Sequence, residues 1–146
     1  MSMTWARLAA STSCSRKVLT PKGLRTLSPN HPLYKGTFED KGDLRAEAAH
    51  QGSVYPFLIF PFLKTYLDIH KRGGLSFALQ IMEGFEEEMS VNCVGSISEV
   101  YEGNPPFTAQ GAISQAWNVG GILAAAALLE KYEEQKEGRK IEEVEK

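Results

Sequence analysis

The stretch LSFALQIMEGFEEEMS, residues 75–90, decides the fold class, because its apolar side chains recur at the spacing of an α-helix. At 3.6 residues per turn, one face collects these side chains: Leu75, Ala78, Leu79, Met82, Phe85 and Met89. The acidic run over residues 86–88 is most simply the solvated side of the same helix. The pattern therefore predicts an amphipathic helix over residues 75–90.

Two more segments with helical spacing lie on either side of this stretch. Residues 54–71 are apolar nearly all round, and Pro61 should kink their helix or mark its true start. Residues 111–137 carry an apolar stripe made of Ile113, Ala116, Trp117, Gly120, Leu123, Ala124, Ala127 and Leu128. We expect an all-α fold of about three main helices with long loops and little or no long strand. Three such helices make a poor closed bundle, which indicates part of a larger structure.

The remaining segments are expected to be loops and two unusual ends. Turn signals follow closely over residues 18–52, and Gly, Ser and Pro are frequent in residues 91–110. The first 38 residues contain basic side chains and no acid, as an organelle transit peptide does, but a disordered or poorly defined N-terminus is the simpler interpretation. We divide the chain into this N-terminus (1–17), one domain (18–137) and a charged tail (138–146).

Composition excludes several classes of function. The chain has 146 residues, of which 42% are hydrophobic and 23% charged, as expected for one globular domain. Its net charge of −2 gives no electrostatic basis for binding nucleic acid, and no apolar run is long enough to span a membrane. Cys14 and Cys93 are its two cysteines, so a reducing compartment, the cytoplasm, is expected. Zinc, P-loop and dinucleotide motifs do not occur, and we expect no metal and no cofactor.

The segment GSISEVYEGNPPFTAQGAISQAWN, residues 95–118, contains the residue types of a sugar site. Glu99 is a carboxylate expected in a loop, and aromatic and amide side chains follow it: Tyr101, Asn104, Phe107, Gln110, Gln115 and Trp117. Carboxylates and amides hydrogen-bond hydroxyls, aromatic faces cover the apolar side of a sugar ring, and one carboxylate can activate water. By composition alone, however, a loop glutamate is more often a solvated residue or a helix cap.

Three motifs in the same order carry a family resemblance. They are GLRTLSP at residues 23–29, HQGSVYPFL at residues 50–58, and a set of matches in the segment that follows residue 94: Gly95, Ile97, Ser98, Glu99, Gly103, Pro106, Gly111, Gln115, Ala116, Trp117 and Val119. Together they resemble the C-terminal part of the glycogen debranching enzyme family, its amylo-α-1,6-glucosidase domain. The resemblance covers roughly residues 18–130.

This resemblance implies an (α/α)6 barrel, of which the chain would be the C-terminal portion, and inverting hydrolysis of the α-1,6-linked glucose at a glycogen branch. Inversion needs one carboxyl group to protonate the leaving oxygen and another to activate water. Glu99 matches the family's general base. The family's general acid is an aspartate well upstream of the first motif, and the 22 residues before Gly23 contain no acid. We therefore expect the acid and most of the barrel to be missing from this chain.

The resemblance also gives candidate substrate-binding residues: His50, Gln51, Gln115 and Trp117. Each has a structural alternative, namely capping or packing for His50 and Gln51, a loop cap for Gln115 and core packing, the favoured role, for Trp117. Arg25 is expected to tie loops together. Glu102 either holds its loop through backbone amides or is solvated.

Several positions depart from the family pattern. Before His50, the family's acid and aromatic residue are replaced by Ala46 and Ala49. Tyr55 and Phe57 replace two tryptophans, Glu102 replaces an aspartate, and Ala112 replaces a cysteine. Together these changes indicate a relaxed constraint on the sugar site, or a divergent branch of the family.

Two hypotheses about function follow. In the first, the chain is a debranching enzyme fragment that acts on an α-glucan, glycogen or limit dextrin, once the upstream part of the same enzyme completes it as a separate chain. In the second, it is a non-catalytic carbohydrate- or partner-binding helical module. A degenerate copy that folds poorly is a third possibility.

Overall fold

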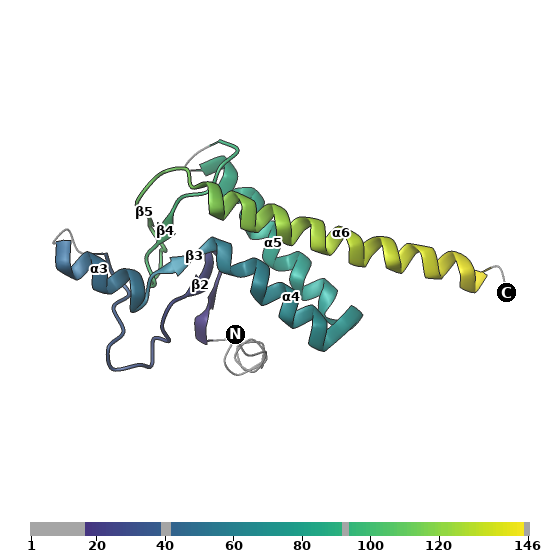
Figure 1. Ribbon diagram of the computed structural model, residues 1–146, viewed down its shortest axis with the longest axis horizontal. Coiled ribbons are helices and arrows are strands. Elements are labelled where there is room, and N and C mark those ends of the chain that lie inside the picture. Colours follow the sequence, from purple (N-terminus) through teal and green to yellow (C-terminus); the bar gives the residue numbers. More distant parts are fainter. Residues whose placement is uncertain (1–16, 39–41, 92–93, 145–146) are drawn as a thin grey trace.

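The computed structural model describes residues 17–38, 42–91 and 94–144 (Figure 1). Its elements follow in the order β1 (Leu19–Thr20), β2 (Gly23–Arg25), α3 (Gly42–His50), β3 (Val54–Tyr55), the 3-10 turn η1 (Pro56–Leu58), α4 (Ile59–His70), the 3-10 turn η2 (Lys71–Gly74), α5 (Leu75–Val91), β4 (Val100–Tyr101), β5 (Ala109–Gln110) and α6 (Ala116–Val144). Figure 1 shows α4, α5 and α6 side by side. The strands and α3 lie at the left, where α4 and α6 begin. The molecule therefore has a helical end and a sheet end.

The sheet end consists of five very short antiparallel strands in the order β1-β2-β3-β4-β5. Leu24 pairs with Tyr55, Val54 with Tyr101, and Val100 with Gln110. The sheet thus joins three stretches of chain that are distant in the sequence, and each of the three contains one of the family-like motifs.

The all-α prediction is wrong at this end of the molecule, since the described residues are mostly helical but include a small sheet. Residues 18–52 are not wholly irregular, because they hold β1, β2 and α3, and β4 and β5 interrupt the loop expected over 91–110. Strands of two or three residues are too short to show a period of two in the sequence, and α3 has no apolar stripe. Periodicity therefore could not reveal these elements.

The first long helix begins later than its apolar pattern indicated. Residues 54–55 form β3 and Pro56–Leu58 form η1, so that α4 starts at Ile59. Pro61 then lies in the first turn of α4, where a missing backbone donor costs little. The interpretation of Pro61 as a marker of the helix start is confirmed.

The last helix buries a different face from the one predicted. It starts at Ala116, not at residue 111, and over residues 116–134, where burial is described, its buried side chains are Asn118, Ile122, Ala125 and Leu129. Six of the eight members of the predicted stripe are exposed: Ile113, Ala116, Trp117, Gly120, Leu123 and Ala127. The sequence is apolar on more than one side of α6, so the stripe was ambiguous, and packing against α4, η1 and α5 selects the face.

The helical end is held together by apolar side chains from α4, α5 and α6. Its fully or almost fully buried members include Ile59, Phe62, Leu63, Leu67, Leu75, Ala78, Phe85, Ile122, Ala125 and Leu129. Val54, Ile97 and Tyr101 extend the same cluster into the sheet end. One continuous core therefore anchors the short strands to the helices.

A buried polar group also connects the two ends. Glu88, expected on the solvated side of α5, is only 2% exposed. Its carboxylate accepts a hydrogen bond from the Tyr101 hydroxyl at 2.8 Å and forms an ion pair with Lys22. The contact fixes α5 against β4 and the β1–β2 turn.

Two predicted boundaries fall at the limits of the described residues. The expected N-terminal segment lies outside them except for Lys17, and α6 carries the backbone of the expected tail as far as Val144. Within the described part of the chain, none of the helices has the length and apolar character that crossing a membrane requires.

Candidate functional site

Glu99 lines an open pocket of about 530 Å³ at the sheet end. The walls come from α3, β3, β4 and the turn before α6: Phe38, Gly42, Ala46, Ala49, Tyr55, Glu99, Val100 and Gly111. Glu99 is the one carboxylate among these lining residues. The short sheet thus brings the expected general base next to residues from a helix that begins more than fifty positions earlier.

The Glu99 side chain is held by main-chain groups of the opposite turn. Its backbone N–H donates to the Ala112 carbonyl at 2.8 Å, and its Oε2 accepts from the Ala112 N–H at 2.9 Å. Gly111 has a φ of +72°, and a Cβ atom there would lie 2.5 Å from Glu99 Oε2. A glycine is therefore required where the chain passes the carboxylate.

Tyr55 forms an aromatic wall of the same pocket. Burial raises the pKa of its phenol, and the negative charge of Glu99 raises this pKa further. The ring meets Phe57 edge to face, with centroids 5.9 Å apart. At neutral pH Tyr55 thus presents a protonated hydroxyl beside a carboxylate, an arrangement that suits a polyhydroxyl ligand.

Asn118, in the first turn of α6, binds the backbone of two segments that line this pocket or adjoin its lining. Its Oδ1 accepts from the Phe57 N–H at 3.1 Å, and its Nδ2 donates to the carbonyls of Ser98 at 2.6 Å and Glu99 at 2.8 Å. The side chain is fully buried. One amide therefore joins α6 to the chain around Tyr55 and to the chain around Glu99.

The loop after β4 is tied down from two directions. Arg25 donates from Nε to the Gly103 carbonyl at 2.8 Å and from Nη1 to the Lys17 carbonyl at 3.1 Å, and its guanidinium lies 5.7 Å from the centre of the Phe107 ring. Glu102 accepts from the Phe38 N–H at 3.2 Å. The expected role of Arg25 as a tie between loops is confirmed, and Glu102 holds a backbone amide.

The four candidate substrate-binding residues lie outside the lining of the Glu99 pocket. His50 is exposed at the end of α3, one residue after the lining Ala49, and the Gln51 backbone bonds to Ala48 and Lys35. Gln115 precedes α6, and its carbonyl accepts from the backbone of Asn118 and Val119. The structure places Glu99 and Tyr55 in the same pocket, whereas the four candidate substrate-binding residues are not part of its lining.

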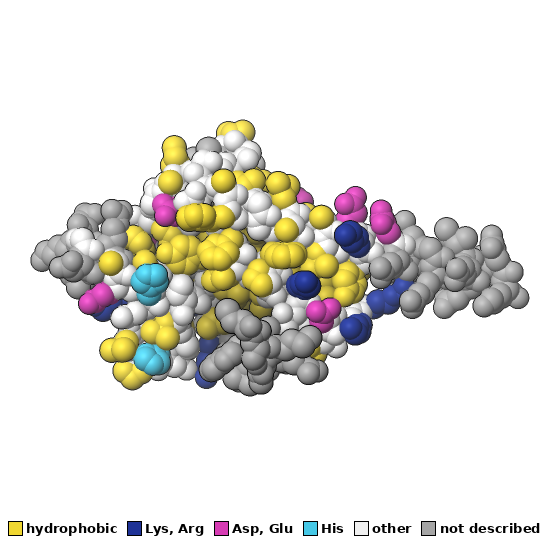
Figure 2. All heavy atoms as spheres, in the orientation of Figure 1, with side chains coloured by type: hydrophobic (Ala, Val, Ile, Leu, Met, Phe, Trp, Pro, Cys, Tyr) yellow, Lys and Arg dark blue, Asp and Glu magenta, His cyan; other side chains and the backbone are white. Residues whose placement is uncertain are grey.

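The core-packing role favoured for Trp117 is wrong. Trp117 is 60% exposed in the first turn of α6, because Asn118 and Ile122 take the buried face. Hydrophobic side chains gather in the middle of the face shown in Figure 2, over the region of β3, α4 and α6. Trp117 is therefore accessible to a ligand or to another protein segment.

Sequence analysis missed Tyr55 and Asn118 as members of the site. In the sequence, Tyr55 is marked only by its replacement of a tryptophan of the family pattern. Asn118 gave a usable signal, because it is the one amide in the apolar run from Ala116 to Leu129. A buried amide in such a run must find hydrogen-bond partners, and here the partners are the site backbone.

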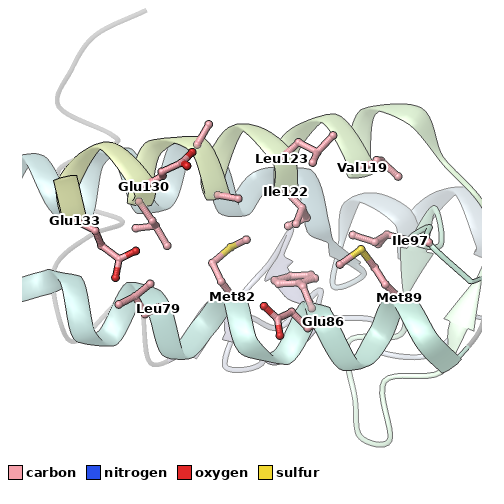
Figure 3. Close-up of a pocket in the computed structure, with 15 residues that line it drawn as sticks. Leu79, Met82, Glu86, Met89, Ile97, Val119, Ile122, Leu123, Glu130 and Glu133 are labelled. Atoms are coloured by element: carbon pink, nitrogen blue, oxygen red, sulfur yellow. The ribbon is translucent and has the colours of Figure 1, made fainter.

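A second, larger hollow lies between α5 and α6 and has a different character (Figure 3). Its volume is about 780 Å³, and its lining is mainly apolar, with Leu79, Met82, Met89, Ile97, Val119 and Leu123 among its members. Figure 3 shows Glu86 on α5 and Glu130 and Glu133 on α6 among the apolar side chains. It does not combine a carboxylate with hydrogen-bonding loops as the Glu99 pocket does, so we place the candidate site at Glu99.

Within residues 17–38, 42–91 and 94–144, no three His, Cys, Asp or Glu side chains come together in a group that could hold an ion. The chemistry of the Glu99 pocket is that of one carboxylate, one phenol and main-chain groups.

Comparison with known proteins gives one match. A family model described as amylo-alpha-1,6-glucosidase matches residues 4–124, which include the pocket lining and the first turns of α6. Neither the curated proteins nor the solved structures provide a match.

Proposed function

The chain belongs to the amylo-alpha-1,6-glucosidase family, and we propose that it supplies the water-activating part of a site that hydrolyses α-1,6-linked glucose in glycogen or limit dextrin. The observation that carries this proposal is the position of Glu99, a carboxylate fixed by backbone groups in the wall of an open pocket. In an inverting reaction such a group removes a proton from the water that attacks the sugar.

The pocket geometry supports the base role of Glu99. The Ala112 N–H fixes one carboxylate oxygen, so the side chain has a defined orientation before any ligand enters. Pre-orientation of a catalytic group lowers the entropy lost on reaching the transition state. The Tyr55 hydroxyl, next to it, is suited to donate a hydrogen bond to a sugar oxygen.

The general acid would come from an upstream part of the enzyme. Glu99 is the one carboxylate in the pocket lining, and inverting hydrolysis needs a second carboxyl group about 6.5–9.5 Å away. We propose that α4, α5 and α6 belong to the C-terminal portion of an (α/α)6 barrel, and that the upstream portion brings the acid. The exposed side chains of Phe57, Trp117 and Leu123 support this, because further helices would cover them.

His50, Gln51, Gln115 and Trp117 remain proposed contacts to the glucan. His50 and Trp117 are both exposed and come from α3 and α6. They would contact sugar units beyond the one that reaches Glu99. Trp117 offers a flat apolar surface of the kind on which sugar rings stack.

The test measures glucose release from an α-1,6-branched limit dextrin. The 146-residue chain alone should release no glucose at a useful rate, whereas a mixture with an upstream family segment that carries the acid should. Glu99→Gln should then reduce the rate by about 10²–10⁴-fold, because glutamine cannot take up the proton. Glu87→Gln, an exposed change on α5, is the matched control and should leave the rate unchanged.

Two results would overturn the proposal. Efficient hydrolysis by the chain alone would mean that a carboxylate within it, such as Glu102 or Glu47, acts as the acid. Full activity of the Glu99→Gln variant in the completed enzyme would mean that the base lies elsewhere.

The alternative function is a non-catalytic module that binds an α-glucan or a partner. The presence of a single carboxylate in the pocket lining favours it over complete catalysis by this chain. Dextrin binding by the chain, combined with no hydrolysis after the upstream segment is bound, would support this alternative.

A further inference from the structure

Asn118 is the most completely engaged buried polar side chain around the Glu99 pocket. It is 0% exposed, and its amide makes three hydrogen bonds, all to main-chain atoms of other segments. The two acceptors are the consecutive carbonyls of Ser98 and Glu99, and the donor is the Phe57 N–H. No other residue type of this size offers two donors and an acceptor in one plane.

The partners fix the orientation of this amide. Two carbonyl oxygens on one side require the NH₂ group, and one N–H on the other side requires the amide oxygen. A flipped amide would set its oxygen against two carbonyl oxygens. Asn118 therefore holds both segments in a single arrangement.

The two segments both contribute to the lining of the site. Phe57 follows Tyr55 by two residues, and Tyr55 and Glu99 both line the pocket. Glu99 is also bound through its N–H and its Oε2, in both cases to Ala112. Asn118 supplies the third attachment, at the carbonyl, so that Glu99 is held at its backbone N–H, its backbone carbonyl and its carboxylate.

We propose that Asn118 is a positioning residue, which fixes the Glu99 carboxylate and the Tyr55 wall relative to each other by binding the backbone of both. This inference rests on the proposed role of Glu99 as the base. It also explains how the attachment of α6 to the helical end is transmitted to the site. Ile122 and Ala125 pack α6 into the core, and Asn118 in the same helix binds the backbone segments next to Tyr55 and at Glu99.

The experiment uses Asn118→Asp in the full chain. Aspartate keeps the shape and the oxygen that accepts from Phe57, but it lacks both donors to Ser98 and Glu99. Asn118→Ala removes all three bonds and serves as the second variant, in case one of the two fails to fold. Thr20→Ala is the matched control, because Thr20 is also a buried polar residue with two hydrogen bonds to the backbone, in the β1–β2 turn.

Two readouts report the geometry of Glu99 without any need for activity. Amide hydrogen exchange at Ala112 should become about tenfold faster in Asn118→Asp than in the parent chain, relative to core amides of α4, because the carboxylate and carbonyl of Glu99 are no longer fixed. The Tyr55 pKa, followed by NMR of its labelled ring, should fall in Asn118→Ala, in the same direction as in Glu99→Gln, since the Glu99 carboxylate moves away from the phenol and no new charge is added. Thr20→Ala should change neither.

The outcomes separate this inference from the proposed function. If Asn118→Asp and Asn118→Ala fold and neither readout moves, Asn118 has no positioning role, even if Glu99→Gln abolishes activity in the completed enzyme. If both readouts move as stated while Glu99→Gln stays fully active, the base assignment fails and Asn118 positions a carboxylate that is not catalytic. If both proposals hold, Asn118→Asp in the completed enzyme should lower kcat more than it changes KM.

Discussion

The helical end and the sheet end of this molecule are stabilised in different ways. Leu63 and Leu67 in α4 and Phe85 in α5 are buried through their apolar surface, and their contribution depends on volume. At the sheet end, Asn118, Arg25 and Glu102 hold loops through individual hydrogen bonds to main-chain atoms. The comparison shows that the part closest to the candidate chemistry depends on single polar atoms, whereas the part that supports it depends on packing.

The two hollows show the same contrast. The groove between α5 and α6 is the larger and is mainly apolar, whereas the Glu99 pocket is smaller and bounded by turns with defined hydrogen bonds. Size alone would have pointed to the groove. A catalytic pocket is recognised by converging polar groups, and these occur at the sheet end.

The largest expected effect tests the helical end. Leu63→Ala removes a fully buried side chain of α4 and should lower the free energy of unfolding by about 2–5 kcal/mol, measured by urea denaturation. The matched control is Leu123→Ala in α6, the same chemical change at a side chain that is 64% exposed, which should cost less than about 0.5 kcal/mol. Equal losses in the two variants would contradict the packing described for α6.

The next effect tests the polar link between the two ends. Lys22→Met removes the Lys22 ammonium from buried Glu88 and should lower the free energy of unfolding by about 1–3 kcal/mol, because that ion pair is lost while the Tyr101 hydrogen bond stays. Lys35→Met breaks the more exposed pair with Glu47 and should cost less than about 1 kcal/mol. Denaturation of both variants in the same buffer measures the difference. A larger loss in Lys35→Met would show that Glu88 does not link the two ends.

A smaller effect appears only at alkaline pH. Burial and the hydrogen bond to Glu88 raise the pKa of Tyr101 well above its usual value of 10.0. Above that value the unfolded chain loses a phenol proton that the native chain keeps, so stability must fall as the pH rises. In Tyr101→Phe this fall should be shallower by up to about 1.4 kcal/mol per pH unit. Unfolding curves between about pH 9 and 11 measure it, and identical slopes for the two proteins would contradict the buried phenol.

The smallest effect on stability is expected for Trp117→Ala. The side chain is 60% exposed, so the free energy of unfolding of the chain alone should change by less than about 0.5 kcal/mol. Binding of limit dextrin or of the upstream segment should weaken, because a flat apolar surface is lost. Calorimetric titration with each partner separates the two roles. A stability loss above about 2 kcal/mol would restore the core role of Trp117.

The same contrast explains what could be predicted from the sequence. The helical spacing of residues 75–90 predicted α5 almost to its ends, because a helix repeats its signal over several turns. The strands could not be predicted, since pairs such as Val54 with Tyr101 are set by packing between distant segments. The motif singled out Glu99 as a candidate, whereas its contact with Ala112 depends on backbone geometry that leaves no pattern in the sequence. The single amide in an apolar run marks Asn118 as a buried hydrogen-bonding residue, but the sequence does not reveal its partners.

Gly111 determines how inherited variation at this position should be interpreted. It carries no side chain and lines the Glu99 pocket with its backbone, yet any replacement adds a Cβ atom 2.5 Å from Glu99 Oε2 and forces a positive φ of +72° on a residue that resists it. Every missense codon at position 111 therefore acts on the carboxylate and would resemble a change of Glu99 itself. A mutational scan scored by function would mark this exposed glycine as intolerant, while a scan scored by abundance would register only the cost of the backbone strain.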